Sequence, residues 1–436
     1  MSAEGPEAAP RWQARSLPDL SRRFVSSEFT RHVAQTFATR MFGIAAVAAT
    51  TIVVARTLGP DGRGLYAAAA ALAALGAQFG NLGLQTSNTY FVTQDREHAS
   101  ALVGNTLVVS LVVLPLTALL VYIVFEVFPT IAPVHGALLG LALLAIPFTV
   151  AMLLLQNLLL GLHDIRSYNA LDLGSKLGTF LLLLLLIAAA HASASLLFGA
   201  SVLIAMLASL WGWWRATTPI SRRPQVSMPL FRRMVAYGLR AYLGAFFAFL
   251  LLRSDLLLVQ YYRGPTDTGY YSVAVNMADM LYILPAVVGA LLFPRFVAMT
   301  DSEARWRWAR RGAAGIGVVL AAMAVISALV AGPVVRVVFG SAYSPAVRPF
   351  VVLAVAMIFY GANNVISNYA ASAGYPWFAV LVWVAGATLN ILLNLVLIPR
   401  YGITGSAVAS LIGYGAVMLA QSVYFSRWKG HVASPA

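Results

Sequence analysis

Twelve apolar stretches, each long enough to cross a lipid bilayer, constrain this chain more than any other feature. A helix needs about 20 apolar residues to cross a hydrocarbon core of roughly 30 Å. The stretches are expected at 36–56, 65–92, 100–125, 133–160, 168–190, 194–214, 236–261, 270–297, 312–331, 346–373, 377–398 and 404–426. Since backbone polar groups in lipid must bond internally, each stretch is predicted to be α-helical. We therefore predict an all-α integral membrane protein with about twelve transmembrane helices.

The composition excludes several classes of protein. Apolar residues make up 60% of the chain and charged residues only 10%, whereas about a quarter of an ordinary globular chain is charged. So few charges cannot solvate a surface, which excludes a soluble enzyme, a disordered protein and a nucleic-acid-binding domain. The net charge of +14 is attributed instead to membrane topology and to contact with anionic membrane lipids.

The placement of Lys and Arg predicts the orientation. With the N-terminus inside, nineteen of the 29 basic residues fall in inner segments and four within spans. The six remaining residues fall in outer loops and are Arg56, Arg63, Arg263, Arg336, Arg348 and Arg400. Because cytoplasmic loops carry an excess of positive charge, both termini are expected in the cytoplasm.

The chain repeats itself at about half its length. A shift of 205 positions pairs Gly59-Pro60 with Gly264-Pro265, Gly64 with Gly269, and Tyr66 with Tyr271. The shared chemistry is a tight turn, a helix restart and an aromatic residue at the membrane interface. Both copies follow an odd-numbered span, so the halves run in the same direction and are predicted to be parallel repeats around a central cleft.

The repeat gives the expected domain organisation. We predict a cytoplasmic N-terminal tail (1–35), an N-terminal six-helix bundle (36–214), a basic cytoplasmic linker (215–235), a C-terminal six-helix bundle (236–426) and a cytoplasmic C-terminal tail (427–436). Two such bundles that rock about a site between them would give alternating access to the two sides of the membrane.

Four basic residues inside the spans are candidates for binding an anionic head group: Arg40, Lys176, Arg240 and Arg253. Ionisable residues within spans are costly and usually functional, and Arg binds phosphate oxygens through paired hydrogen bonds. The alternative for Lys176 is a structural pair with Asp172, four residues earlier on the same helix. Arg40 and Arg240 have the alternative of extending to lipid head groups.

Two acidic residues are candidates for coupling transport to a proton or Na⁺. Asp279 lies near the middle of the eighth span and Asp255 in the outer half of the seventh. A carboxyl without a partner in a low dielectric suits proton carriage. The alternatives are that Asp279 is a permanently protonated, hydrogen-bonded core residue and that Asp255 neutralises a nearby Arg.

Amide side chains recur within the spans. Asn81, Gln85 and Asn88 follow helical spacing in 65–92 and predict one polar stripe, and Asn364 lies in the tenth span. Such groups facing a wet cleft would suit sugar hydroxyls. Hydrogen bonding between helices is the alternative for each of them.

Motifs of enzyme chemistry are missing from the sequence. It has no cysteine, no phosphate-binding P-loop and no HExxH, and its six His are far apart. We therefore expect no enzymatic activity, no metal and no cofactor other than a possible coupling ion, a proton or Na⁺.

Five segments, taken in order, resemble a known family. They are Ala55–Tyr66, Arg253–Asp255, Leu292–Arg295, Phe339–Val347 and Asn390–Ser410. Together they resemble bacterial polysaccharide exporters, the Wzx-type flippases for polyprenyl-pyrophosphate-linked oligosaccharides. That family belongs to the multidrug/oligosaccharidyl-lipid/polysaccharide transporter superfamily, with the multidrug extrusion transporters and the lipid II flippases.

The resemblance implies a function. It implies a flippase that moves a lipid-linked oligosaccharide from the inner to the outer leaflet of the bacterial cytoplasmic membrane, for surface polysaccharide synthesis. A polysaccharide polymerase and glycosyltransferases are the protein partners it implies. Two alternatives stay open: a cation-coupled multidrug antiporter of the same superfamily, and a non-transporting membrane partner in envelope polysaccharide assembly.

Overall fold

The computed structural model describes residues 27–94, 98–218, 224–299 and 301–427, and within these ranges it contains helices and no β-strand. The helices of the first half are α2 (Ser27–Gly80), α3 (Leu84–Gln94), α4 (Ala99–Val108), α5 (Leu114–Val127), α6 (Gly136–Gly161), α7 (Ile165–Ala188) and α8 (Ala194–Thr217). Those of the second half are α9 (Met228–Ala298), α10 (Ser302–Val338), α11 (Val347–Ser372) and α12 (Trp377–Arg427). A π-helix, Val109–Val113, joins α4 to α5, and short 3-10 helices, Pro129–Ile131 and Ser341–Ala346, precede α6 and α11.

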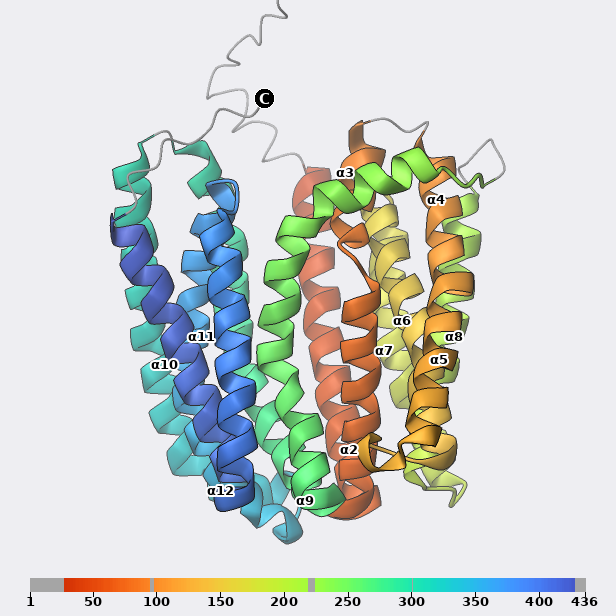
Figure 1. The fold of residues 1–436 in the computed structure, drawn as a ribbon, viewed down its shortest axis with the longest axis vertical. Helices are drawn as coiled ribbons and strands as arrows, with labels where there is room; N and C mark the ends of the chain where they lie inside the picture. The colour runs from red at the N-terminus through yellow and green to blue at the C-terminus, as the bar shows by residue number, and fades with distance from the viewer. Residues whose placement is uncertain (1–26, 95–97, 219–223, 300, 428–436) are drawn as a thin grey trace, which may run out of the picture.

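Three of the long helices reverse direction at a glycine. Gly59 in α2, Gly264 in α9 and Gly402 in α12 have φ values of 65°, 79° and 58°. Side chains disfavour this region, whereas glycine enters it freely. Nine described helices are long and apolar enough to cross a membrane, and these reversals give three of them two crossings each. The prediction of an all-helical fold with about twelve crossings is therefore confirmed (Figure 1).

One expected helix is in fact broken. The stretch 65–92 was predicted as a single span, but α2 ends at Gly80 and α3 begins at Leu84. Between them, Leu82 and Gly83 have positive φ values of 48° and 77°. Two glycines within four residues make this segment a poor helix former, so the predicted single stripe of Asn81, Gln85 and Asn88 does not exist.

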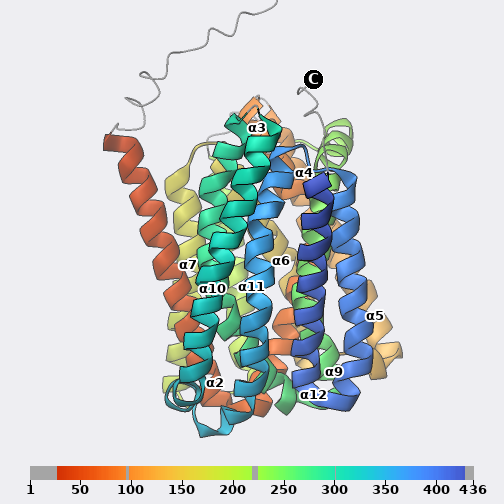
Figure 2. The same cartoon turned by 90° about the vertical axis from the view of Figure 1, so that its left-hand side faces the viewer.

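The two ends of the bundle differ. The described chain begins and finishes at the same end, which we call the terminus end (Figures 1 and 2). The reversals within α2, α9 and α12 lie at the opposite end, which we call the glycine end (Figure 1). At the terminus end, the first turns of α9 cross over the first half, where the Ser87 hydroxyl donates to the Met234 carbonyl at 2.6 Å.

Each half has its own apolar core. One cluster of buried apolar side chains comes mainly from α9 to α12, and a second comes from α2 to α8 and the start of α9. α2 and α9 lie side by side at the centre (Figure 1). The precise division into bundles at 214 and 236 stays a prediction.

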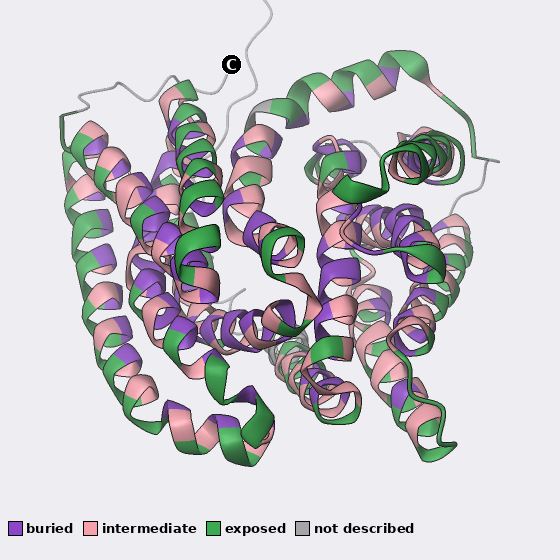
Figure 3. Ribbon diagram, turned by 60° about the horizontal axis from the view of Figure 1, so that its bottom comes forward, coloured by how far each residue is buried: buried purple, intermediate pink, exposed green. Residues whose placement is uncertain are grey.

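The outward faces of the helices are apolar, as a lipid environment requires. Exposed residues lie on the outer surfaces of the peripheral helices (Figure 3). On α10, Val318 and Leu329 are 72% and 77% exposed. Apolar side chains this exposed, on a helix this long, are stable against hydrocarbon and not against water.

Candidate functional site

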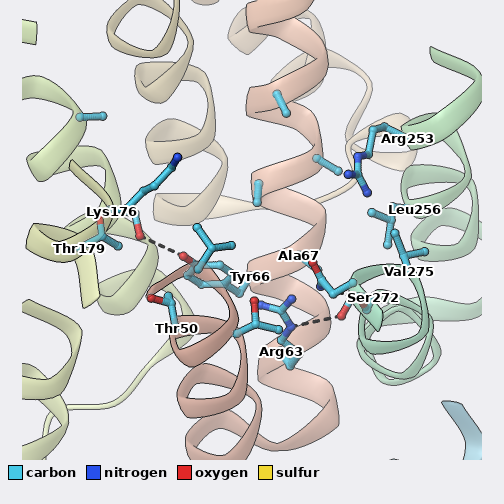
Figure 4. Close-up of a pocket in the computed structure, with 18 of the residues that line it drawn as sticks. Thr50, Arg63, Tyr66, Ala67, Lys176, Thr179, Arg253, Leu256, Ser272 and Val275 are labelled. Atoms are coloured by element: carbon cyan, nitrogen blue, oxygen red, sulfur yellow. Dashed lines mark hydrogen bonds between the residues drawn. The ribbon is translucent and has the colours of Figure 1, made fainter. Parts of the chain in front are cut away.

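A cavity of about 420 Å³ lies where α2 and α9 meet α7 and α8 (Figure 4). Its wall is mostly small and apolar, with Ala67, Ala70 and Ala71 on one side and Leu256 and Val275 on another. Three basic residues reach it, Arg63, Lys176 and Arg253, whereas none of the described residues that line it is acidic. The cavity is therefore suited to a group that carries negative charge.

Lys176 has a partner on its own helix. Its Nζ lies 2.7 Å from Asp172 Oδ2, one turn earlier on α7, and both side chains are about 30% exposed. The spacing of four residues places the two charges on one helix face. Lys176 thus contributes a charge to the cavity that is already paired.

Arg253 also has an acidic partner, which corrects an expectation. Its Nη2 lies 2.7 Å from Asp279 Oδ2, so Asp279 is not the partnerless carboxyl expected from the sequence. The reversal at Gly264 brings the second crossing of α9 back beside the first, which places position 279 next to position 253. Asp279 therefore supplies the direct ion pair to Arg253, and the neutralising role named as an alternative for Asp255 stays a prediction.

Asp255 belongs to a buried network in the second half. It is 1% exposed and accepts hydrogen bonds from the Tyr271 hydroxyl at 2.6 Å and from the Leu256 amide at 2.8 Å. Ser410 of α12 lies 3.5 Å away. These donors satisfy the carboxylate inside the second half and keep it out of the cavity wall.

Arg63 is the cavity residue that sequence reasoning missed. It was assigned to an outer loop, but helix α2 restarts at Pro60 and carries Arg63 into the interior, where it is 5% exposed. Its Nε donates to Ser272 Oγ at 3.2 Å, and its guanidinium lies 5.6 Å from the Tyr66 ring centroid. The signal was available: Pro favours the first position of a helix, so a residue three places later lies one turn inside.

The other predicted residues lie elsewhere. Arg40 is exposed, and the side chain of Arg240 lies outside the described residues. Asn364 donates to the Tyr282 hydroxyl at 2.7 Å and lines a separate cavity of about 170 Å³ within the second half. The two amides Asn81 and Asn88 are buried and, like Gln85, absent from the wall of the central cavity.

Asn88 illustrates what these amides do. Its Nδ2 lies 3.3 Å from Thr106 Oγ1 on α4 and 3.3 Å from the Leu154 carbonyl on α6. A buried amide that joins three helices in this way stabilises their packing. The geometry fits the structural alternative for this residue.

Next to the cavity, the two repeated turns pack against each other at the glycine end. A Cβ added to Gly64 would lie 1.7 Å from the Pro265 carbonyl oxygen, and one added to Gly269 would lie 1.9 Å from that of Pro60. We call this pairing of Pro60, Gly64, Pro265 and Gly269 the reciprocal turn contact. Only glycine allows backbones to approach this closely.

Three further contacts join the halves at the same end. Thr266 Oγ1 lies 3.2 Å from Asp61 Oδ1, and the Tyr343 hydroxyl donates to the Ala55 carbonyl at 2.8 Å. Arg56 Nε donates to the Val338 carbonyl at 2.7 Å. The glycine end is therefore held shut by contacts between elements of the two halves.

The apolar helices, long enough to cross a membrane, and the cavity between the two halves define a multi-pass membrane protein. A family described as "Polysaccharide biosynthesis protein" matches residues 53–348, and the chain belongs to this family. This confirms the family resemblance seen in the sequence.

Individual relatives agree with the family. The chain is 24% identical over 215 residues to the uncharacterized membrane protein MJ1068 of Methanocaldococcus jannaschii, covering 47% of this chain and 41% of that protein. It is 22% identical over 252 residues to the probable low-salt glycan biosynthesis flippase Agl15 of Haloferax volcanii, covering 57% and 52%. The matched part thus spans about half the length of these curated relatives.

The fold is shared with a solved flippase. The structure of "Lipid II flippase MurJ, inward closed conformation" superposes with a TM-score of 0.72 at 14% identity, covering 91% of this chain and 87% of that one. At this identity the likeness concerns the fold alone.

Proposed function

We propose that this protein flips a lipid-linked oligosaccharide across the membrane, with the anionic head group of the carrier passing through the central cavity. The observation that carries the proposal is the cavity wall, which holds Arg63, Lys176 and Arg253 and, among the described lining residues, no acid. Family membership in polysaccharide biosynthesis and the relative named as a flippase support it. The protein then acts as a transporter and not as an enzyme.

The physical chemistry of the cargo fits this wall. A polyprenyl pyrophosphate carries clustered negative charge that lipid cannot solvate, and Arg binds phosphate oxygens through a planar fork of donors. The mostly apolar remainder of the wall would leave the sugars to be held by few polar groups, such as Thr50, Ser175 and Asn276. The polyprenyl tail would stay in lipid while the head crosses between the halves.

The direction of transport follows from the proposed orientation. The excess of basic residues in segments at the terminus end supports a cytoplasmic position for both termini. The glycine end would then face outward, and it is closed in this conformation. We propose that the head group is taken from the inner leaflet of the bacterial cytoplasmic membrane and released to the outer leaflet, next to the polymerase and glycosyltransferases of surface polysaccharide synthesis.

Any coupling ion would act through the Arg253–Asp279 pair. Protonation of Asp279, or Na⁺ binding to it, would free Arg253 to bind the anionic head. Asp255 is the less suitable candidate, because its donors already satisfy it. Collapse of the proton and Na⁺ gradients should then slow flipping by the parent protein, and Asp279→Asn should remove that dependence; flipping unaffected by either change would contradict ion coupling.

The charge of the wall argues against the rival functions. A cation-coupled drug antiporter needs acidic groups for cationic drugs, and the described lining residues offer none. A non-transporting assembly partner has no need for buried, unpaired charge at its centre.

The test is flipping in proteoliposomes with a fluorescent polyprenyl-pyrophosphate oligosaccharide. We expect protein-dependent flipping by the parent and a loss in Arg253→Ala. Arg336→Ala is the matched control, because Arg336 is exposed in the last turn of α10 and lies outside the cavity wall. Absence of flipping by folded parent protein, with and without ion gradients, together with uptake of a cationic drug, would overturn the proposal in favour of the antiporter.

A further inference from the structure

We propose that Arg63 is both an anion-binding residue and the latch of the glycine end, so that an anion in the cavity releases the contact between the two halves. This inference rests on the proposed function for the nature of the anion, a pyrophosphate group. It adds a residue that couples head-group binding to opening.

Arg63 is the basic residue of the cavity whose charge is unbalanced. Lys176 and Arg253 each lie 2.7 Å from a carboxylate oxygen, whereas no carboxylate of the described chain forms an ion pair with Arg63. Its partners are the neutral Ser272 hydroxyl and the Tyr66 ring. A buried cation without an acidic partner is strongly unfavourable, and a ligand anion would remove that cost.

The position of Arg63 ties it to the contact between the halves. It lies in α2, next to Gly64 of the reciprocal turn contact, and its acceptor Ser272 lies in the second crossing of α9. Both side chains line the cavity, and Figure 4 shows them side by side, joined by this hydrogen bond. One guanidinium therefore joins the cavity to the closure of the glycine end.

The coupling follows from competition for one side chain. A pyrophosphate oxygen is a stronger acceptor for Arg than a neutral hydroxyl, since both partners carry charge. An anion that turns the guanidinium toward the cavity removes the bond to Ser272 and so weakens the closed state. Because a ligand shifts an equilibrium by its differential affinity, an anion that binds more tightly when Arg63 is free favours the open state.

Close packing of backbone against backbone in the reciprocal turn contact also stabilises the closed state. The reciprocal turn contact depends on bare backbone at Gly64 and Gly269, so it is either fully formed or lost. A packed contact of this kind has two discrete states rather than a continuous range, which makes it suitable for a switch.

The test uses the absence of cysteine from this chain. Ile131→Cys and Tyr401→Cys place one spin label on each half at the glycine end, at side chains that are 51% and 66% exposed. The distance between the labels is measured by electron paramagnetic resonance in the purified full-length protein, with inorganic pyrophosphate as the probe. We expect pyrophosphate to shift the distances in the parent to longer values.

Arg63→Gln should give longer distances already without pyrophosphate, because the latch is lost. Any further shift should need about tenfold more pyrophosphate, because a charge-assisted bond to the anion is lost. Arg63→Lys, which keeps the charge, should fall between the two and serves if the Gln variant does not fold. Arg56→Gln is the matched comparison: Arg56 also bridges the halves at this end but does not line the cavity, so this variant should respond at no higher pyrophosphate concentration than the parent. Gly64→Ala should give the long distances without pyrophosphate.

Four results would overturn the inference: no shift in the parent, an equal response in Arg63→Gln, an equal loss in Arg56→Gln, or parent-like short distances in Gly64→Ala. The failure of the proposed function is distinct. If the parent responds to pyrophosphate but flips no lipid-linked oligosaccharide, the latch is supported and the flippase function is contradicted. If the parent flips the oligosaccharide but does not respond to pyrophosphate, the function is supported and the latch is contradicted.

Discussion

The two halves share a turn and differ in how they treat charge. Gly59 and Gly264 adopt nearly the same backbone, with φ of 65° and 79° and ψ of −177° and −175°. Four residues after each lies a different side chain. In the first half it is Arg63, whose charge is unpaired; in the second it is Thr268, fully buried, whose hydroxyl donates to the Gly264 carbonyl at 2.9 Å.

The same difference holds for the charged groups at the centre of α9. There Arg253 pairs with Asp279, and Asp255 accepts a hydrogen bond from Tyr271. The first half leaves a cation at the cavity and bonds it only to a hydroxyl across the interface. The repeat thus supplies a symmetric scaffold, and the function that we propose depends on the departure from symmetry.

Disrupting the reciprocal turn contact, to which both halves contribute, should have the largest effect on flipping. Gly64→Ala and Gly269→Ala each force a methyl group into a backbone carbonyl, and overpacking of this kind costs ~1–3 kcal/mol. Flipping should fall by about tenfold in both variants, since 1.4 kcal/mol is tenfold in an equilibrium. The proteoliposome assay measures it, and Gly315→Ala, which meets no atom within 4 Å, should match the parent. If only one of the two substitutions reduced flipping, the two turns would not be equivalent in function.

Removing Asp279 should leave Arg253 without an acidic partner, which is already the situation of Arg63. Asp279→Asn leaves Arg253 without its ion pair, and an unpaired charge at such a site costs about 2 kcal/mol, discounted because both side chains are roughly a quarter exposed. The thermal unfolding temperature in detergent should fall accordingly. An unchanged unfolding temperature would show that the cavity already solvates Arg253.

Breaking the hydrogen-bond network around Asp255 should lower the stability of the protein by a smaller amount. Tyr271→Phe removes the 2.6 Å bond to Asp255 and leaves a buried acceptor short of one donor, which costs about 1–2 kcal/mol. The adjacent Tyr270→Phe is the matched control, with only ring contacts to lose. Equal destabilisation by the two changes would mean that the hydroxyl bond contributes nothing.

Loss of the ion pair between Lys176 and Asp172 within α7 should lower stability the least. Lys176→Gln breaks an ion pair four residues apart, an interaction worth about 0.3–0.5 kcal/mol. The unfolding temperature should barely change, whereas flipping should fall if Lys176 meets the head group. A large loss of stability would contradict the geometry of a partly exposed pair.

Much of the fold was predictable from the sequence because hydrocarbon imposes simple rules. The lengths of the apolar runs gave the crossings, and the match between Gly59-Pro60 and Gly264-Pro265 indicated two equivalent reversals. The break at Leu82 and Gly83 was missed because hydropathy continues across it. An apolar run does not report a change of backbone direction.

The site was predictable only in part. Lys176 and Arg253 were expected at the cavity and line it, whereas Asn81 and Asn88 pack elsewhere. The pairing of Arg253 with Asp279, 26 residues away, depends on how two helices rotate about their axes, which spacing within one helix cannot give. Arg63 was misplaced because a charged residue beside a Gly-Pro turn resembles a loop residue.

The most direct test of the account is the flipping rate of Arg63→Gln beside that of Thr268→Val, its counterpart in the repeat, in proteoliposomes that carry the same polyprenyl-pyrophosphate oligosaccharide. The account predicts that Arg63→Gln loses most of the flipping, by about tenfold or more, because the cavity then lacks its unpaired cation. Thr268→Val should flip at close to the parental rate, since its hydroxyl bonds only within its own turn. Equal rates for the two variants, or a greater loss in Thr268→Val, would contradict the claim that an anionic head group passes through this cavity.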